Sequence, residues 1–247
     1  MKALILNSGI GHRMGALTQD RPKALVELTP GQTLFGRQLT QLAAAGLREA
    51  VVTTGPFADA LQAHAAALGL PLHITYVHNP EYASTNYIVS MHRAAPQLRG
   101  EEVLLLHGDL VLQPDVLAEL LNAPRSVMAV DSTLPLPDKD FKARLRNGQI
   151  VAVGVEFFGA DCVACQPAYR FTAADFARWL DAIEAFVRRG ERNVYAENAF
   201  NALDGSLPLA PLELGGRLCA EMDNPQDLDS IRARLVAAQL GKGRDHA

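Results

Sequence analysis

The sequence has few cysteines and no long apolar run. Its three cysteines are an odd number, and only Cys162 and Cys165 lie close together. A zinc site would need a second pair of thiols or nearby histidines, so we interpret the cysteines as buried thiols in a reducing compartment. No apolar run approaches the length of a membrane span, and Ala3–Leu6 is too short for the core of a signal peptide. These absences predict a cytoplasmic protein without a membrane partner.

An excess of positive charge is also absent. The 247 residues contain 23 Lys and Arg against 27 Asp and Glu, which gives a net charge of −4. Such a chain has no general electrostatic attraction to nucleic acid. Nucleic acid is therefore not an expected partner, and any phosphate binding must be local. Hydrophobic residues make up 49% of the chain, which suffices for a packed core.

Strand and helix patterns alternate along the chain, which is typical of an α/β fold. The apolar run Lys2–Leu6 predicts a buried strand, and the amphipathic spacing of Thr172–Arg189 predicts a helix. Asn147-Gly148 between two apolar stretches predicts a β-hairpin. Because no internal repeat or linker interrupts the chain, we predict one domain over residues 1–247, in which residues 132–215 form a lobe on the substrate side.

A glycine-containing segment follows the first predicted strand. It reads Leu6-Asn7-Ser8-Gly9-Ile10-Gly11-His12-Arg13-Met14-Gly15, and Pro22-Lys23 comes shortly after it. Glycines at such a turn let the backbone approach a phosphate or a base, and Arg13 and Lys23 supply the positive charge that a triphosphate needs. The segment lacks the third glycine of a dinucleotide fingerprint and the Gly-Lys-Ser/Thr of a Walker loop. A plain strand-to-helix turn is the alternative.

Two aspartates are candidate ligands of a metal ion. Asp109 follows the apolar strand Val103–Leu106, where open α/β sheets bind ligands. Asp223 can converge on the same place from a distant part of the chain, and Mg²⁺ is held by one or two carboxylates together with phosphate oxygens. The alternatives are a turn residue for Asp109 and the N-cap of the last helix for Asp223. His107 is expected to pack at the end of the strand.

Together these motifs resemble the signature of the sugar-nucleotide and cytidylyl transferase superfamily, which opens Leu-x-x-Gly-x-Gly-x-Arg-Met and continues to Pro-Lys. The resemblance implies a Rossmann-like nucleotidyltransferase fold, with a mixed, mostly parallel central sheet flanked by helices. It also implies Mg²⁺ as cofactor, bound by Asp109 and Asp223, which act in catalysis together with Arg13 and Lys23. Asn7-Ser8 replaces the usual Ala-Ala, which leaves the choice of base open.

Three further segments are similar to the phosphocholine cytidylyltransferase-like branch of that superfamily. They are Asn79-Pro80-Glu81-Tyr82 with Asn86 and Ser90, then Gly108-Asp109, and finally Glu221-Met222-Asp223 with Asp227-Leu228. The resemblance implies that the nucleotide is bound by Leu6, Asn7, Ser8, Gly9, Gly11, Arg13, Lys23, Asn79, Asn86, Ser90 and Gly108. For Asn86 and Ser90, which share a helix face, the alternative is a helix-capping segment with Ser84 or Thr85 as the cap.

The acceptor is predicted from two places. Phosphocholine enzymes carry a Tyr-Trp pair before an acidic residue, and the corresponding segment here reads Tyr195-Ala196-Glu197. Since choline is usually held by aromatic faces, the missing tryptophan disfavours choline. The charged stretch that follows Asp131 resembles a loop of phosphonate cytidylyltransferases, with a solvated loop as the alternative. The residues expected to bind the acceptor are Asp131, Asp140, Lys142, Tyr195 and Glu197.

From these features we expect a Mg²⁺-dependent cytidylyltransferase that transfers CMP from CTP to a small phosphonate or phosphoester and releases pyrophosphate. The alternatives within the enzyme class are a sugar-1-phosphate nucleotidyltransferase and a phosphocholine cytidylyltransferase. A catalytically silent nucleotide-binding regulator is a third alternative, against which the intact Arg13, Lys23, Asp109 and Asp223 argue. The expected partners are the two substrates, and a homodimer is allowed for.

Overall fold

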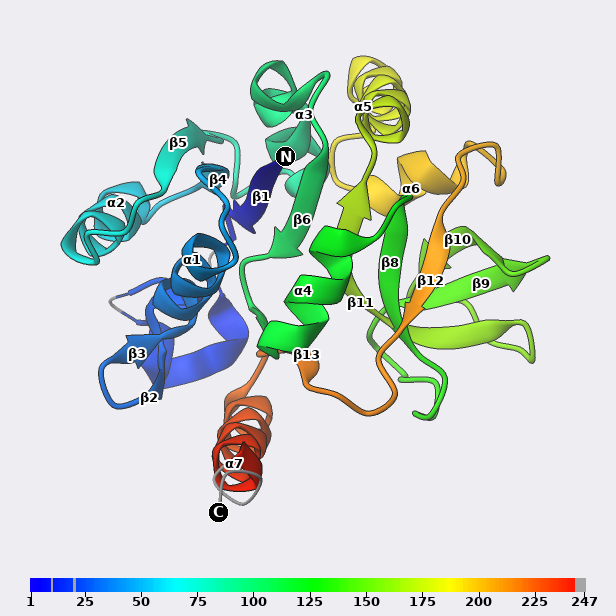
Figure 1. Ribbon diagram of the computed structural model, residues 1–247. Coiled ribbons are helices and arrows are strands. Elements are labelled where there is room, and N and C mark those ends of the chain that lie inside the picture. The colour runs from blue at the N-terminus through cyan, green and yellow to red at the C-terminus, as the bar shows by residue number, and fades with distance from the viewer. Residues whose placement is uncertain (10, 20, 243–247) are drawn as a thin grey trace.

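The computed structural model describes residues 1–9, 11–19 and 21–242. A nine-stranded sheet forms the centre of the molecule, with helices packed against it (Figure 1). The predicted α/β fold with a mixed central sheet is therefore confirmed. Within the described ranges, no helix combines the length and the apolar character needed to cross a membrane.

Four parallel strands form the part of the sheet that carries the glycine-containing segment. In the order β6-β1-β4-β5 they are β1 (Lys2–Asn7), β4 (Glu49–Thr54), β5 (His73–His78) and β6 (Val103–His107). Leu6 lies opposite Thr53 on one side and His107 on the other. The carboxyl ends of these strands therefore meet at one edge, which is where open parallel sheets bind ligands.

A long strand that the sequence patterns did not predict joins this part to the rest of the sheet. It is β11 (Cys162–Phe171), which pairs antiparallel with β6, β8 (Val127–Asp131) and β9 (Lys142–Arg146). Gln166, which is polar, and Pro167 interrupt its apolar pattern where the register with β8 shifts. The sequence therefore does not show the regular alternation that is typical of a strand. Beyond β11, β9 and β10 (Gln149–Gly154) form the predicted hairpin, and β12 (Ala210–Glu213) pairs with β8.

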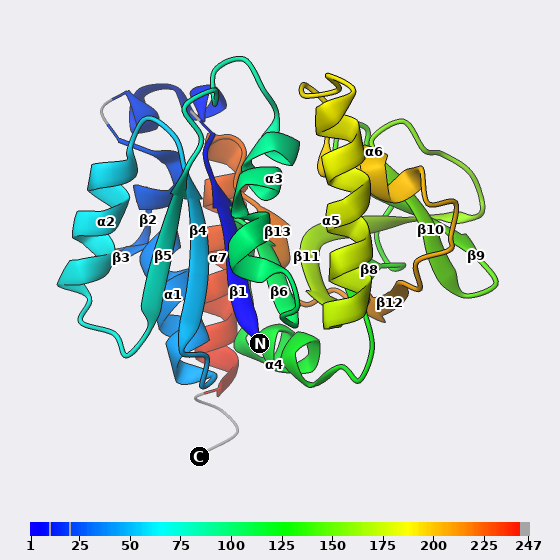
Figure 2. The same cartoon turned by 90° about the horizontal axis from the view of Figure 1, so that it is seen from above.

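Helices cover both faces of the sheet, as the two views show (Figures 1 and 2). Alternate side chains of β1 enter separate cores, because Leu4 packs with α3 and α5 while Ala3 and Ile5 pack with α1 and α4. The helices are α1 (Leu34–Ala44), α2 (Ala58–Ala67), α3 (Tyr87–Leu98), α4 (Pro114–Asn122), α5 (Ala173–Arg188), α6 (Ala196–Asn201) and α7 (Pro225–Lys242). Thr172 caps α5 by accepting from the backbone N–H of Asp175, at the start of the helix that the sequence predicted.

Two small sheets and two short 3-10 helices complete the ligand-binding edge. They are β2 (Glu27–Thr29) with β3 (Gln32–Thr33), β7 (Leu110–Leu112) with β13 (Cys219–Glu221), and the 3-10 helices η1 (His12–Thr18) and η2 (Lys23–Leu25). Leu110 lies opposite Glu221, and the backbone N–H of Met222 donates to the carbonyl of Asp109 at 2.9 Å. This pairing brings the segment after β13 to the end of β6.

Candidate active site

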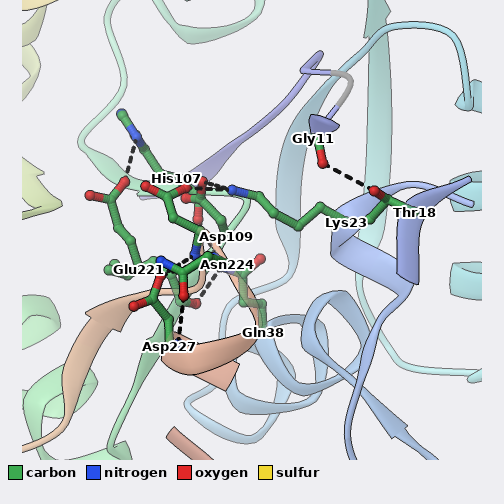
Figure 3. A network of polar contacts seen from close by, with 11 residues as sticks. Gly11, Thr18, Lys23, Gln38, His107, Asp109, Glu221, Asn224 and Asp227 are labelled. Atoms are coloured by element: carbon green, nitrogen blue, oxygen red, sulfur yellow. Dashed lines mark hydrogen bonds and ion pairs between the residues drawn. The ribbon is translucent and has the colours of Figure 1, made fainter. Parts of the chain in front are cut away.

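Lys23, Asp109 and Asp223 meet at the carboxyl edge of the parallel strands. The Lys23 ammonium donates to Oδ2 of Asp109 at 2.5 Å and to Oδ1 of Asp223 at 2.9 Å, and Figure 3 shows Lys23 extended toward Asp109. Burial favours the neutral amine, but the two carboxylates outweigh burial and raise the pKa of Lys23. Burial likewise opposes ionisation of Asp109, and Lys23 and His107 overcome it and lower the pKa of Asp109. The site therefore holds a charged amine against the charged carboxylate of Asp109.

The carboxylate of Asp223 is not the N-cap of the last helix. Asn224 takes that place, because its Oδ1 accepts from the backbone N–H of Asp227 at 3.0 Å. Asp227 in turn accepts from the backbone N–H groups of Asp223 and Asn224. This reciprocal capping fixes the backbone at the start of α7 and leaves the side chain of Asp223 to face Lys23.

The possible metal-ligand atoms around Asp109 suit a hard divalent cation. Oδ1 of Asp109 is buried and has no hydrogen-bond donor among the described residues. His107, Asp109 and Glu221 each offer one ligand atom, and these atoms lie within 4.8 Å of one another. Carboxylate oxygens are the usual protein ligands of Mg²⁺, and a single positive charge already lies between Asp109 and Asp223 in the form of the Lys23 ammonium.

His107 and Glu221 form a second pair that the sequence reasoning did not assign. Nδ1 of His107 lies 3.5 Å from Oε1 of Glu221. The His107 ring packs edge-on against the Tyr87 ring, with 4.9 Å between the ring centroids. Burial, with the charge of Asp109, raises the pKa of Glu221 to about 7 against the opposing effect of His107. Burial disfavours the His107 cation, but Glu221 and Asp109 outweigh it and raise the pKa of His107. The signal in the sequence was Glu221 itself, which precedes Met222-Asp223 in the closing motif.

The glycine-containing segment lines a cavity of 440 Å³ together with Lys23, Asp109 and Asp223. Gly11 has a left-handed φ of 75°, and a Cβ there would lie 2.9 Å from Cβ of Lys23. A Cβ at Gly108 would lie 1.8 Å from Oδ1 of Asn7. Only glycine allows these close approaches. Arg13 falls in η1, but its side chain, like Ile10, lies outside the described residues.

An adjoining cavity of 200 Å³ shares Leu6, Gly9 and Asp109 with the first. The other predicted nucleotide-binding residues on it are Ser8, Asn79, Asn86 and Ser90. Nδ2 of Asn79 donates to Oγ of Ser90 at 3.1 Å, so this pair is a buried structural contact. Asn86 itself caps α3 by accepting from the backbone N–H of Tyr87, so the cap is one or two residues later than the expected Ser84 or Thr85. Nδ2 of Asn7 and Oγ of Ser8 are buried and lack partners among the described residues.

The five residues expected to bind the acceptor do not converge. The carboxylate of Asp131 accepts from Thr133 and from the backbone N–H of Gly216, so it ties two loops together. The buried ammonium of Lys142 donates to the carbonyl of Pro137 at 2.7 Å. Asp131 and Lys142 were expected to contact an acceptor. In the structure, the charged atoms of both side chains are already hydrogen-bonded to other parts of the fold.

The other three residues expected to bind the acceptor lie in three different environments. Glu197 is 2% exposed and accepts from the hydroxyls of Tyr87 and Tyr169, so it holds two aromatic residues rather than a ligand. Asp140 lies on the exposed loop between β8 and β9. Tyr195, at the start of α6, lines a cavity.

Comparison with known proteins gives the family. Residues 3–200 match the MobA-like NTP transferase domain. The chain is 34% identical over 136 residues to CMP-5'-(3-aminopropyl)phosphonate synthase of Streptomyces rubellomurinus, a match that covers 55% of this chain and only 21% of that protein. It is 24% identical to CTP:phosphoglutamine cytidylyltransferase of Campylobacter jejuni, over 93% of this chain and 98% of the relative.

Solved structures give the same fold. The structure is similar to that of CTP:phosphocholine cytidylyltransferase from Streptococcus pneumoniae, with a TM-score of 0.74 and 18% identity over 95% of this chain and 98% of that one. The predicted Rossmann-like fold is thus confirmed, and the matching family agrees with the predicted class, a nucleotidyltransferase. The chain belongs to the family of MobA-like NTP transferase domains.

Proposed function

We propose that the protein is a Mg²⁺-dependent cytidylyltransferase that transfers CMP from CTP to a small phosphonate or phosphoester and releases pyrophosphate. The observation that carries the proposal is the convergence of Lys23, Asp109 and Asp223 beside a cavity lined by Gly9 and Gly11. A family relative that spans nearly the whole chain is named a cytidylyltransferase, and another is named for a CMP-phosphonate product. Both names favour cytidine as the base and a phosphate-bearing acceptor.

The residues of this chain have separable roles in such a reaction. The turn at Gly9 and Gly11 would let backbone N–H groups contact the triphosphate. Asp109 and Asp223 would hold Mg²⁺, which when bound neutralises charge on the phosphates. Lys23 would place its ammonium against the phosphate oxygens and stabilise the charge that develops as pyrophosphate leaves. No protein nucleophile is required, because an oxyanion of the acceptor attacks the α-phosphorus and the bond to pyrophosphate breaks.

A pyrophosphate-release screen tests the proposal. The purified protein is incubated with Mg²⁺ and with CTP, UTP, ATP or GTP, against 2-aminoethylphosphonate, 2-hydroxyethylphosphonate, phosphocholine and glucose-1-phosphate. We expect release with CTP and a phosphonate, formation of the CMP conjugate, and loss of both on addition of EDTA. A preference of about tenfold or more in kcat/KM for phosphocholine or the hexose phosphate would contradict the proposed acceptor. Nucleotide binding without release by any pair would identify a silent regulator instead.

A further inference from the structure

A third cavity, of 430 Å³, continues from the two at the candidate active site. Asn86 lines both this cavity and the middle one. Tyr87 of the middle cavity and Tyr195 of the third have ring centroids 5.8 Å apart. The third cavity lies where α6 meets β10, two elements that Figure 2 shows side by side. An acceptor bound at the first cavity could therefore extend toward the third.

The third cavity has one formal charge in its lining. Among the described residues that line it, Glu156 is the only acidic or basic one, and the polar groups around it are those of Asn86, Asn193, Asn198 and Tyr195. Within the described ranges, Glu156 makes no ion pair and no hydrogen bond, and the side chains of Asn193 and Asn198 make no hydrogen bond. The cavity thus offers, at an exposed rim, the carboxylate of Glu156 and side-chain amide oxygens that have no partner within the described residues.

Nearby basic residues are engaged elsewhere. The ammonium of Lys142 lies 4.0 Å from the ring centroid of Phe158 and donates to the carbonyl of Pro137. The guanidinium of Arg144 lies 4.3 Å from the ring centroid of Phe157 and pairs with Asp161. These contacts leave the carboxylate of Glu156 without a counter-charge among the described residues.

Gly154 lies directly against the carboxylate of Glu156. A Cβ at Gly154 would lie 2.6 Å from Oε2 and 2.9 Å from Oε1 of Glu156, so any larger residue there would displace the carboxylate. The cavity wall itself is fixed, because Asn201 of α6 exchanges two hydrogen bonds of 2.8 Å with the backbone of Val153.

We infer that this cavity binds an amine at the far end of the acceptor, with Glu156 as its counter-charge. The inference rests on the proposed function and narrows its substrate class to small aminoalkyl phosphonates or phosphoesters. An ammonium has three donors and no acceptor, which matches a carboxylate surrounded by amide oxygens. The ring of Tyr195 adds a surface for a cation. Glu156 thus replaces Asp131, Asp140 and Glu197, the carboxylates expected from the sequence to bind the acceptor.

Direct binding measurements test this inference independently of turnover. The affinities of 2-aminoethylphosphonate and 2-hydroxyethylphosphonate, which share the phosphonate and differ in the end group, are measured by calorimetry with Mg²⁺ and a non-hydrolysable CTP analogue. We expect the wild-type protein to bind the amine about tenfold or more tightly, which is about 1.4 kcal/mol. Glu156→Gln should abolish this preference. Gly154→Ala should reduce it, because it moves the carboxylate without removing the charge.

Glu191→Gln is the matched control, because it removes a surface carboxylate paired with Arg189 and should keep the preference. Equal binding of the two phosphonates by the wild-type protein, binding of neither, or a preference that survives Glu156→Gln would each overturn the inference. CMP transfer from CTP, measured separately with the same protein preparations, distinguishes the two proposals. An amine preference that depends on Glu156 without CMP transfer would sink the proposed function alone, and equal transfer to both phosphonates would sink the inference alone.

Discussion

The ammonium of Lys23 lies 2.5 Å from Oδ2 of Asp109, although the two residues are 86 positions apart in the chain. Its second partner, Asp223, is 200 positions away. Lys23 thus holds the two proposed metal ligands together at the edge of the glycine-lined cavity. The first two predictions therefore concern this contact.

Asp109→Asn and Asp223→Asn should each lower kcat/KM for CMP transfer by about a hundredfold or more at saturating Mg²⁺. Each change removes a negative charge that would hold the metal, and a bound metal supplies several kcal/mol of charge stabilisation in the transition state. Circular dichroism should show an unchanged fold. Asp229→Asn, at an exposed position of α7, is the control. Near-normal turnover in either variant would remove that residue from the proposed metal site.

Lys23→Ala should lower kcat by about a hundredfold, with a smaller change in KM for CTP. Lost electrostatic stabilisation of developing charge has effects of this size, and it acts on the transition state rather than on ground-state binding. Steady-state kinetics over a range of CTP concentrations separates the two constants. Lys2→Ala, which removes a lysine paired with Glu101 at the other end of β1, should leave both unchanged. A variant altered only in KM would make Lys23 a binding residue.

Glu197→Ala should destabilise the fold by about 2–4 kcal/mol, because it leaves the hydroxyls of Tyr87 and Tyr169 without their acceptor. Urea unfolding followed by circular dichroism measures the change. Glu197→Gln keeps one carbonyl oxygen as an acceptor and should lose less. If Glu197→Ala were as stable as the wild-type protein while losing affinity for the acceptor, Glu197 would be a ligand-binding residue after all.

The stability of the fold should fall as the pH rises above about 10. Burial, with the charge of Glu197, raises the pKa of Tyr87 and Tyr169 well above the usual value of 10.0. Their protonated phenols contribute stability that is complete below the unfolded pKa, and ionisation of the unfolded chain removes it as the pH rises toward the folded pKa. Urea unfolding between about pH 8 and pH 11 should therefore show a decline that is weaker in Tyr87→Phe/Tyr169→Phe. A double variant with the same slope as the wild-type protein would contradict this origin.

The sequence by itself determined the buried strands and the glycine turn, and it indicated Asp109 as a candidate metal ligand. These features depend on local chemistry. An apolar run such as Lys2–Leu6 predicts a buried strand wherever it lies, and the turn at Gly11 needs a residue that tolerates a left-handed φ. Because parallel strands present their carboxyl ends at one edge, Asp109 at the end of β6 could be placed there without knowing its neighbours.

Only the tertiary structure decided which charged groups remain available to a ligand. The pairing of β7 with β13 brings Asp223 to Lys23, and the capping by Asn224 leaves its carboxylate there. Glu197 is enclosed by tyrosines from α3 and from β11, a strand whose pattern is interrupted, whereas Glu156 is left without a partner on a cavity wall. The reason is physical: a charged side chain is neutralised or left open by groups from distant parts of the chain, and the spacing of its own segment does not contain them.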